Sequence, residues 1–169
     1  SPVSSPPLKD LIPGRGRISI LVPDMTRGSA VRKVLSPLID LIESYGVKRG
    51  RIEILVANGT HRIETEQELT EHLDESVTRQ FRIYQHRADD PERHIRVGAT
   101  PANSDLYLDR QMTDSSLILP VSPVSFHYFA GFGGGRKMIM PGMADRSSIL
   151  SNHRLSLKRN PDEGLSEGC

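Results

Sequence analysis

The sequence lacks several features that would place it in a specialised class of proteins. Its single cysteine, Cys169, is the last residue, so the chain has no disulfide framework of its own. It has 22 basic against 21 acidic residues and no basic stripe interleaved with aromatics, which argues against a nucleic-acid surface. Its apolar runs reach about seven residues, far short of the ~20 that a membrane helix needs, and no signal-peptide core is visible. We expect a cytoplasmic protein that binds neither nucleic acid nor membranes.

What the chain does contain is typical of one globular domain. It has 169 residues, of which 36% are hydrophobic and 25% charged. That length suits a single hydrophobic core. Residues 1–16 are rich in Pro, Gly and Ser and predict an irregular arm, whereas residues 17–155 carry the regular patterns. Residues 156–169 look like a loop that leads into a further part, so we expect a domain of a larger protein; a disordered natural terminus is the alternative.

Hydrophobic patterning predicts strands that alternate with helices. Strands are expected at residues 17–22, 51–57, 81–85 and 115–121, and weaker ones at 94–98 and 105–108 suggest a hairpin. Helices are expected at 29–45, bent or restarted at Pro37, at 65–73 behind a capping box of Thr65 and Glu68, and at 147–154. This order predicts an α/β fold with a Rossmann-like, mostly parallel sheet and flanking helices.

Polar clusters follow the predicted strands where each strand ends. DMTR, residues 24–27, follows the first strand, and NGTHR, residues 58–62, follows the second. His127 and the GFGGGRK run, residues 131–137, follow the strand at 115–121. Because ligands bind beyond the carboxyl ends of the strands in open α/β sheets, we expect these three clusters on one rim. His153 lies on the last helix, just beyond them.

The GFGGGRK run predicts a site more strongly than any single side chain does. Four glycines stand within five residues, at Gly131, Gly133, Gly134 and Gly135. Such a backbone usually approaches a ligand closely or presents its N–H groups to an anion. The run is not a Walker A loop, because Arg136 precedes Lys137 and Met138 follows it. Arg136 should lower the pKa of the Lys137 amine and favour its nucleophilic form, which suits a covalent role.

Each candidate side chain also has a structural explanation. Asp24 could cap a helix, and Arg27 could be a solvated surface charge. His61 could be a loop histidine, His127 a core histidine among aromatics, and His153 a helix-surface residue. We predict that the other histidines, His72, His86 and His94, lie on the surface, because their neighbours in sequence are charged.

Taken together, these motifs resemble a known family. DMTR, NGTHR, the block HYFAGFGGGRKMIMPG and the Asn-His pair sixteen residues after its lysine are similar to those of the nickel-dependent lactate racemases and their 2-hydroxyacid racemase and epimerase relatives. The resemblance runs from about Arg17 to Arg154 and is to the N-terminal domain of these two-domain enzymes. It implies a nickel-pincer nucleotide, a pyridinium mononucleotide whose two sulfur arms and ring carbon hold one nickel ion.

The resemblance also implies roles for individual residues. Lys137 would be joined covalently to the cofactor, and His153 would bind nickel. His61 and His127 would be the acid/base pair, and Arg27 would hold the substrate carboxylate. Asp24 would help to position the cofactor or its neighbours, in a pocket shaped by Gly133, Gly134 and Gly135.

The implied reaction is the racemisation or epimerisation of a small 2-hydroxyacid such as lactate. Hydride would leave C2 for the cofactor and return to the opposite face, while the two histidines move the hydroxyl proton. The implied partners are this substrate, the enzymes that synthesise the cofactor, and a C-terminal domain of the same protein.

The residues alone leave two other functions open. The glycine run with Arg136 and Lys137 would suit a non-catalytic nucleotide- or phosphate-binding module. The three histidines His61, His127 and His153 would suit a metal hydrolase, although no H-E-x-x-H or C-x-x-C spacing supports zinc.

Overall fold

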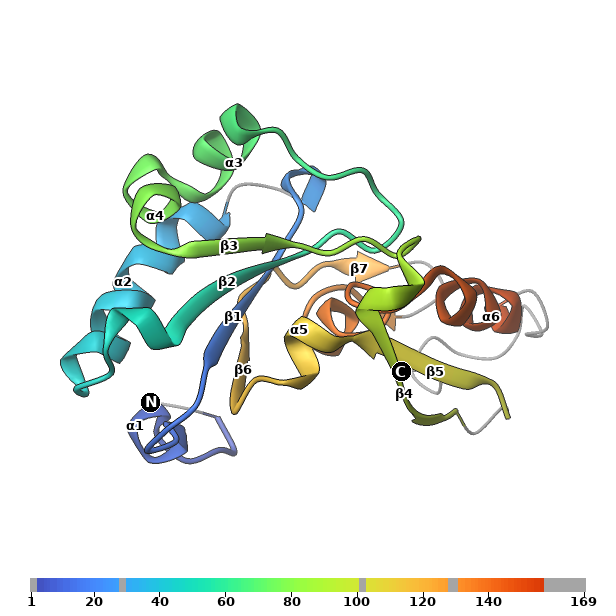
Figure 1. Cartoon of the computed structure of the whole chain (residues 1–169), viewed down its shortest axis with the longest axis horizontal. Coiled ribbons are helices and arrows are strands. Elements are labelled where there is room, and N and C mark those ends of the chain that lie inside the picture. The colour runs from blue at the N-terminus through green and yellow to red at the C-terminus, as the bar shows by residue number, and fades with distance from the viewer. Residues whose placement is uncertain (1–2, 28–29, 101–102, 128–130, 157–169) are drawn as a thin grey trace.

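A four-stranded parallel sheet forms the centre of the protein (Figure 1). The computed structural model describes residues 3–27, 30–100, 103–127 and 131–156. The strands follow the spatial order β3 (Arg82–Gln85), β2 (Ile52–Ala57), β1 (Ile18–Pro23) and β6 (Leu117–Pro120). The predicted α/β class and the Rossmann-like, mostly parallel sheet are therefore confirmed.

The two faces of the sheet are covered by different sets of helices. Ile18, Ile20 and Val22 of β1 point to a core shared with α2 (Ala30–Ser44), α3 (Glu66–Leu73) and α4 (Glu75–Gln80). Leu21 of β1 and Leu55 of β2 point the other way, toward α5 (Arg110–Thr113), the 3-10 turn η4 (Gly135–Met138) and α6 (Arg146–Ser156). Alternate residues of a strand face opposite sides, so apolar runs such as ISILVP are buried on both faces.

Helix α2 is continuous through Pro37, so the predicted restart is wrong, whereas the alternative, a bend at Pro37, stays a prediction. A proline inside a helix removes one backbone hydrogen bond and crowds the preceding turn. Pro37 is exposed, and the helix buries Val31 and Leu35 before it and Ile39 and Ile42 after it. Packing on both sides of the proline therefore keeps the two halves in one helix.

The predicted hairpin is also present. β4 (His94–Ala99) and β5 (Asp105–Asp109) are antiparallel and lie beside α6 at one end of the molecule (Figure 1). A second, very small pair joins β7 (Phe126–His127) to β8 (Gly131–Phe132). The sequence does not predict this pair, α4, α5 or the turns η1 (Met25–Arg27), η2 (Arg49–Arg51) and η3 (Pro91–Arg93). Residues 1–16, predicted to be irregular, contain a short helix, α1 (Leu8–Leu11).

The strand order places a crossover at the centre of the sheet. From β1 the chain moves to β2 and β3 on one side, and it later returns to β6 on the other side of β1. The loops after β1 and β6 therefore diverge at the carboxyl edge, which is where open α/β sheets bind ligands. In the part of the chain that the structure describes, no helix has the length and apolar character that crossing a bilayer requires.

Candidate active site

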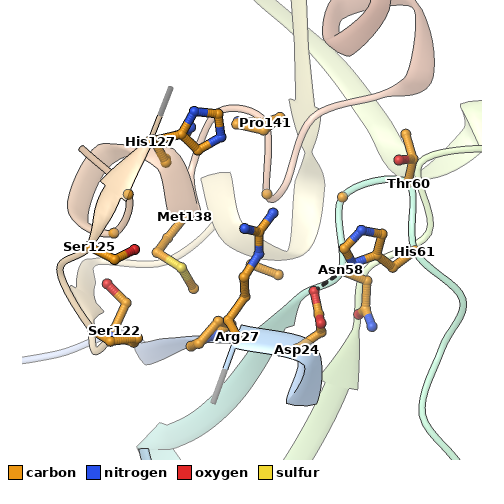
Figure 2. A pocket seen from close by; sticks show the side chains of 18 of the residues that line it. Asp24, Arg27, Asn58, Thr60, His61, Ser122, Ser125, His127, Met138 and Pro141 are labelled. Atoms are coloured by element: carbon orange, nitrogen blue, oxygen red, sulfur yellow. Dashed lines mark hydrogen bonds and ion pairs between the residues drawn. The ribbon is translucent and has the colours of Figure 1, made fainter. Parts of the chain in front are cut away.

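A cavity opens at the carboxyl ends of β1, β2 and β6 (Figure 2). Its walls come from the three polar clusters that the sequence predicts to meet. Its lining includes Asp24, Arg27, Asn58, His61, Ser122, His127, Gly133, Gly134, Lys137 and Gly142. The prediction that these clusters share one rim is confirmed. Two of the predicted residues, Gly135 and His153, are not part of the lining.

Asp24 directly follows β1, is buried, and lines this cavity. One carboxylate oxygen, Oδ2, lies 2.9 Å from His61 Nδ1, and the other accepts a hydrogen bond from the Thr26 backbone N–H at 2.9 Å. The Thr26 hydroxyl also binds this second oxygen. Burial raises the pKa of Asp24, but the hydrogen bonds from Thr26 and His61 outweigh burial and lower it. Asp24 therefore caps the turn η1 and orients His61 at the same time.

The contact with Asp24 determines which ring nitrogen of His61 carries the hydrogen. The ionised carboxylate only accepts hydrogen bonds, so His61 Nδ1 carries the hydrogen. In the neutral ring the lone pair is then on Nε2, the nitrogen that is not engaged with Asp24. The His61 side chain is 46% exposed, against 6% for Asp24. A buried carboxylate behind a solvent-accessible imidazole is the arrangement of a general base.

A second buried pair holds the turn that carries Arg27. Glu64 Oε1 accepts a hydrogen bond from the Met25 N–H at 2.8 Å, and Glu64 Oε2 lies 3.0 Å from His72 Nδ1. Gln85 binds the Glu64 backbone with both ends of its amide. The surface position predicted for His72 is wrong, because this residue is buried. No sequence signal marks Glu64, which follows the NGTHR cluster in a loop.

Arg27 is exposed on the turn η1 and lines the cavity. Its side chain points toward the space between the His61 and His127 rings (Figure 2). A guanidinium in this place is suited to bind a carboxylate through two parallel hydrogen bonds. The geometry thus places a candidate anion-binding group beside two candidate proton-transfer groups.

His127 is half-buried on β7 at the opposite wall from His61 (Figure 2). Burial lowers its pKa, and the positive charges of Lys137, Arg27 and His153 lower it further. His127 is therefore neutral over a wider pH range than an ordinary histidine. His153, which is exposed on α6, is near enough to affect His127 although it does not line the cavity.

The glycine run packs closely against the segment that follows β6. Gly134 has a φ of +83°, and a Cβ built there would lie 2.5 Å from the Pro123 carbonyl oxygen. The Gly133 N–H donates to the Ser125 carbonyl at 2.7 Å, and the Gly135 N–H donates to Ser122 Oγ at 3.1 Å. These two N–H groups therefore stabilise the loop itself, which weighs against a phosphate cradle made of them.

The loop ends by placing Lys137 in the cavity. The Lys137 N–H donates to the Gly134 carbonyl at 3.1 Å and closes the turn η4. The Gly142 N–H binds the Lys137 carbonyl at 3.0 Å, and the Gly142 carbonyl accepts from the Gly59 N–H at 3.0 Å. A Cβ at Gly142 would lie 2.3 Å from the Met138 carbonyl oxygen. This glycine therefore allows the lysine turn to approach the loop that carries His61.

The prediction that His86 and His94 lie on the surface is also wrong. His86, with no exposed surface, and His94, 8% exposed, are buried rather than on the surface. Both lie near Asp109 at the ends of β3, β4 and β5, and neither lines the cavity. The three histidines His61, His127 and His153, in contrast, do not form a group of converging metal ligands in the described part of the chain.

Comparisons with known proteins agree with this geometry. Residues 1–165 match the family described as lactate racemase N-terminal domain. The chain is 31% identical over 153 residues to a lactate racemase of Lactiplantibacillus plantarum, covering 90% of this chain and 36% of that protein. It is 32% identical over 161 residues to a lactate racemase of Thermoanaerobacterium thermosaccharolyticum, covering 95% and 38%.

Solved structures show the same similarity. The lactate racemase apoprotein from T. thermosaccharolyticum superposes with a TM-score of 0.86 at 31% identity, over 95% of this chain and 38% of that one. A crystal structure of a Thermotoga maritima protein superposes with a TM-score of 0.71 at 24% identity, over 86% and 38%, and shows the fold alone. The chain thus spans a little over a third of the length of these relatives.

Proposed function

Because this chain belongs to the lactate racemase N-terminal domain family, we propose that it carries the proton-transfer and cofactor-attachment residues of a 2-hydroxyacid racemase or epimerase. The observation that carries the proposal is the placement of His61 and His127 on one cavity with Arg27 and Lys137. The substrate would be a small 2-hydroxyacid, lactate or a relative. The chain would act with a C-terminal domain of the same protein, which the greater length of the relatives supports, and with the enzymes that synthesise the cofactor.

The residues of the cavity fit a nickel-bearing nucleotide. Lys137 offers an amine for a covalent bond, and imidazole is a ligand that nickel accepts readily. Asn58 lines the cavity, and its buried Oδ1 has no hydrogen-bond partner among the described residues, so it could accept a hydrogen bond from a ligand hydroxyl or amide. Gly134 and Gly142 also line the cavity, and a Cβ at either would meet neighbouring backbone at 2.5 Å or less, so the loop around the lysine packs closely. Lys137 would hold the cofactor, and His153 would bind its nickel.

When bound, the cofactor would accept a hydride from C2 of the substrate and return it to the opposite face. The protein's own task is to move the hydroxyl proton in step with that hydride. His61 Nε2 would take or return this proton from one side, because Asp24 holds Nδ1 in its protonated state. His127, kept neutral by its surroundings, would do the same from the other side. Inversion without net oxidation would use a proton carrier on each side of the substrate, and the placement of a histidine on each wall of the cavity supports this proposal.

Arg27 would orient the substrate between the two imidazoles. Binding the carboxylate through two hydrogen bonds leaves the acid free to present either face of C2 after rotation about the bond to the carboxylate. The Glu64–Met25 hydrogen bond would keep this arginine in place by anchoring its turn.

The full-length protein, co-expressed with the cofactor-synthesis enzymes, tests the proposal. Intact mass should show an adduct on the wild type and on the exposed control Lys33→Ala, and no adduct on Lys137→Ala. Nickel content should follow the adduct. His61→Asn should keep both and lose racemisation. A wild-type protein with neither adduct nor nickel, or a Lys137→Ala variant that keeps its activity, would contradict the proposal.

A further inference from the structure

His86, His94 and Asp109 form a buried cluster on the side of the sheet that faces α6. His86 directly follows β3, His94 begins β4, and Asp109 ends β5. The exposed fractions of His86 and Asp109 are 0%, and that of His94 is 8%. The proposed racemase chemistry uses none of the three. A cluster of ionisable groups this deeply buried requires partners that satisfy each of them.

Backbone carbonyls determine which nitrogen of each histidine carries hydrogen. His86 Nε2 lies 2.9 Å from the Ala144 carbonyl oxygen, and His94 Nδ1 lies 2.8 Å from the Asp90 carbonyl oxygen. A carbonyl only accepts hydrogen bonds, so both of these nitrogens are donors. In the neutral rings the lone pairs are then on His86 Nδ1 and His94 Nε2. Histidines that bind metals usually have this outer hydrogen bond to a carbonyl, which fixes the ring and its tautomer.

Both histidines bring a ring nitrogen close to the Asp109 carboxylate. His86 Nδ1 lies 2.9 Å from Asp109 Oδ2. One nitrogen from each histidine and one carboxylate oxygen all lie within 4.8 Å of one another. His94 Nε2 is buried and has no hydrogen-bond partner in the described part of the chain. A proton shared by His86 and Asp109 would satisfy those two groups but would leave the His94 lone pair unused.

The surroundings keep Asp109 ionised and correctly oriented. The Tyr84 hydroxyl donates to both carboxylate oxygens, at 3.0 and 2.8 Å, and the Gln111 N–H donates to Oδ1 at 2.9 Å. Burial raises the pKa of Asp109, but these bonds and the one with His86 lower it overall. Once the proton between His86 and Asp109 is displaced, the cluster offers one fixed anion and two imidazole lone pairs, a donor set that zinc and similar divalent ions bind.

We propose that His86 Nδ1, His94 Nε2 and the Asp109 carboxylate bind a divalent transition-metal ion of the zinc class. Ligand atoms around tetrahedral zinc are about 3.3 Å apart, so the His86–Asp109 contact would open by about half an ångström. The ion would join the end of β3 to the β4–β5 hairpin. Through the Ala144 carbonyl it would also join both to the segment just before α6, the helix that carries His153. Its role would be structural and separate from that of the nickel cofactor.

Zinc binding to the untagged chain, freed of metal with a chelator, tests this site. Calorimetry and metal analysis after dialysis should give one tightly bound Zn²⁺ per wild-type chain. The same stoichiometry should hold for the triple variant His61→Ala/His127→Ala/His153→Ala, which removes the histidines of the proposed active site. The variant His94→Gln should bind zinc about 100-fold more weakly or worse, because it loses a ligand. The result is independent of the nickel cofactor, which is not supplied.

A measurement on the wild type alone keeps the test valid if His94→Gln does not fold. Imidazole nitrogen NMR before and after zinc should show coordination shifts at His86 Nδ1 and His94 Nε2 and none at His61. The proposal is overturned if the wild type binds no zinc, if zinc binding disappears in the triple variant, or if it persists unchanged in His94→Gln.

Discussion

The Asp24 carboxylate lies 2.9 Å from His61 Nδ1, and both residues line the same cavity. Because Asp24 is 4% exposed and ionised, it leaves His61 one orientation and one tautomer. The same carboxylate binds Thr26 and so joins the DMTR turn to the NGTHR loop. The Asp24–His61 contact therefore brings residues from the loops after two different strands, β1 and β2, into one site.

Replacing Asp24 with Asn should disable His61 without removing it. An amide can donate to Nδ1 and favour the wrong tautomer, so we expect kcat of the cofactor-loaded, full-length protein to fall by about 10²–10⁴-fold. KM should change much less, because Arg27 is intact. Imidazole NMR of the chain should show His61 with its hydrogen moved from Nδ1. Asp40→Asn, the same change on the exposed side of α2, serves as control; equal kcat in the two variants would contradict the role of Asp24.

Removing the charge of Lys137 should raise the pKa of His127. Burial is the first cause of the lowered value and would persist in Lys137→Met, so the pKa should move toward 6.5 without passing it. Proton NMR titration of the His127 ring measures the change, with the exposed Lys33→Met as control. An unchanged His127 titration in Lys137→Met would show that this lysine is too distant to act on it.

The lowered pKa of His127 also makes the stability of the fold depend on pH. A histidine whose folded pKa lies below its unfolded value binds protons less readily in the folded chain. His127 therefore destabilises the fold as the pH drops below about 6.5 toward its folded pKa. The free energy of unfolding should therefore fall less between pH 7.5 and pH 5.5 in Lys137→Met than in the wild type, as measured by urea unfolding at the two pH values.

The rim of the site could be predicted from the sequence because it depends on local patterns. The apolar runs before Asp24 and Asn58 mark buried strands, and parallel strands end at the same edge. The positions of His86 and His94 could not be predicted in this way. The segment between them is charged, and Arg87 and Asp89 are indeed exposed, while His86 and Ala88 point inward. Which side of such a segment is buried depends on the later hairpin and on Ala144, far away in sequence.

Helix α3 offers a prediction in which the sequence and the structure agree in detail. Thr65 Oγ1 accepts from the Glu68 N–H at 3.2 Å, and Glu68 Oε2 accepts from the Thr65 N–H at 2.8 Å. Thr65→Ala should lower the free energy of unfolding by about 1 kcal/mol. Thr70→Ala removes a hydroxyl of the same helix that donates to the Glu66 carbonyl, and it should change the free energy of unfolding by less than half as much. Equal losses in urea unfolding would show that the cap contributes nothing.

The glycine run should tolerate a side chain least at Gly134. A methyl group there would meet the Pro123 carbonyl oxygen at 2.5 Å and Ser122 Oγ at 2.8 Å. The backbone, with φ +83° and ψ −171°, lies in a region that is essentially restricted to glycine and adds a cost of about 1–3 kcal/mol for an L-residue. Relief of both would require the loop to move away from the segment after β6, and Lys137 would move with it. We therefore expect Gly134→Ala to reduce both the free energy of unfolding and the yield of the Lys137 adduct in the full-length protein. Gly50→Ala, at an open position without positive φ, should affect neither. If Gly134→Ala forms the adduct in normal yield while losing stability, the close packing serves the fold and not the placement of the lysine.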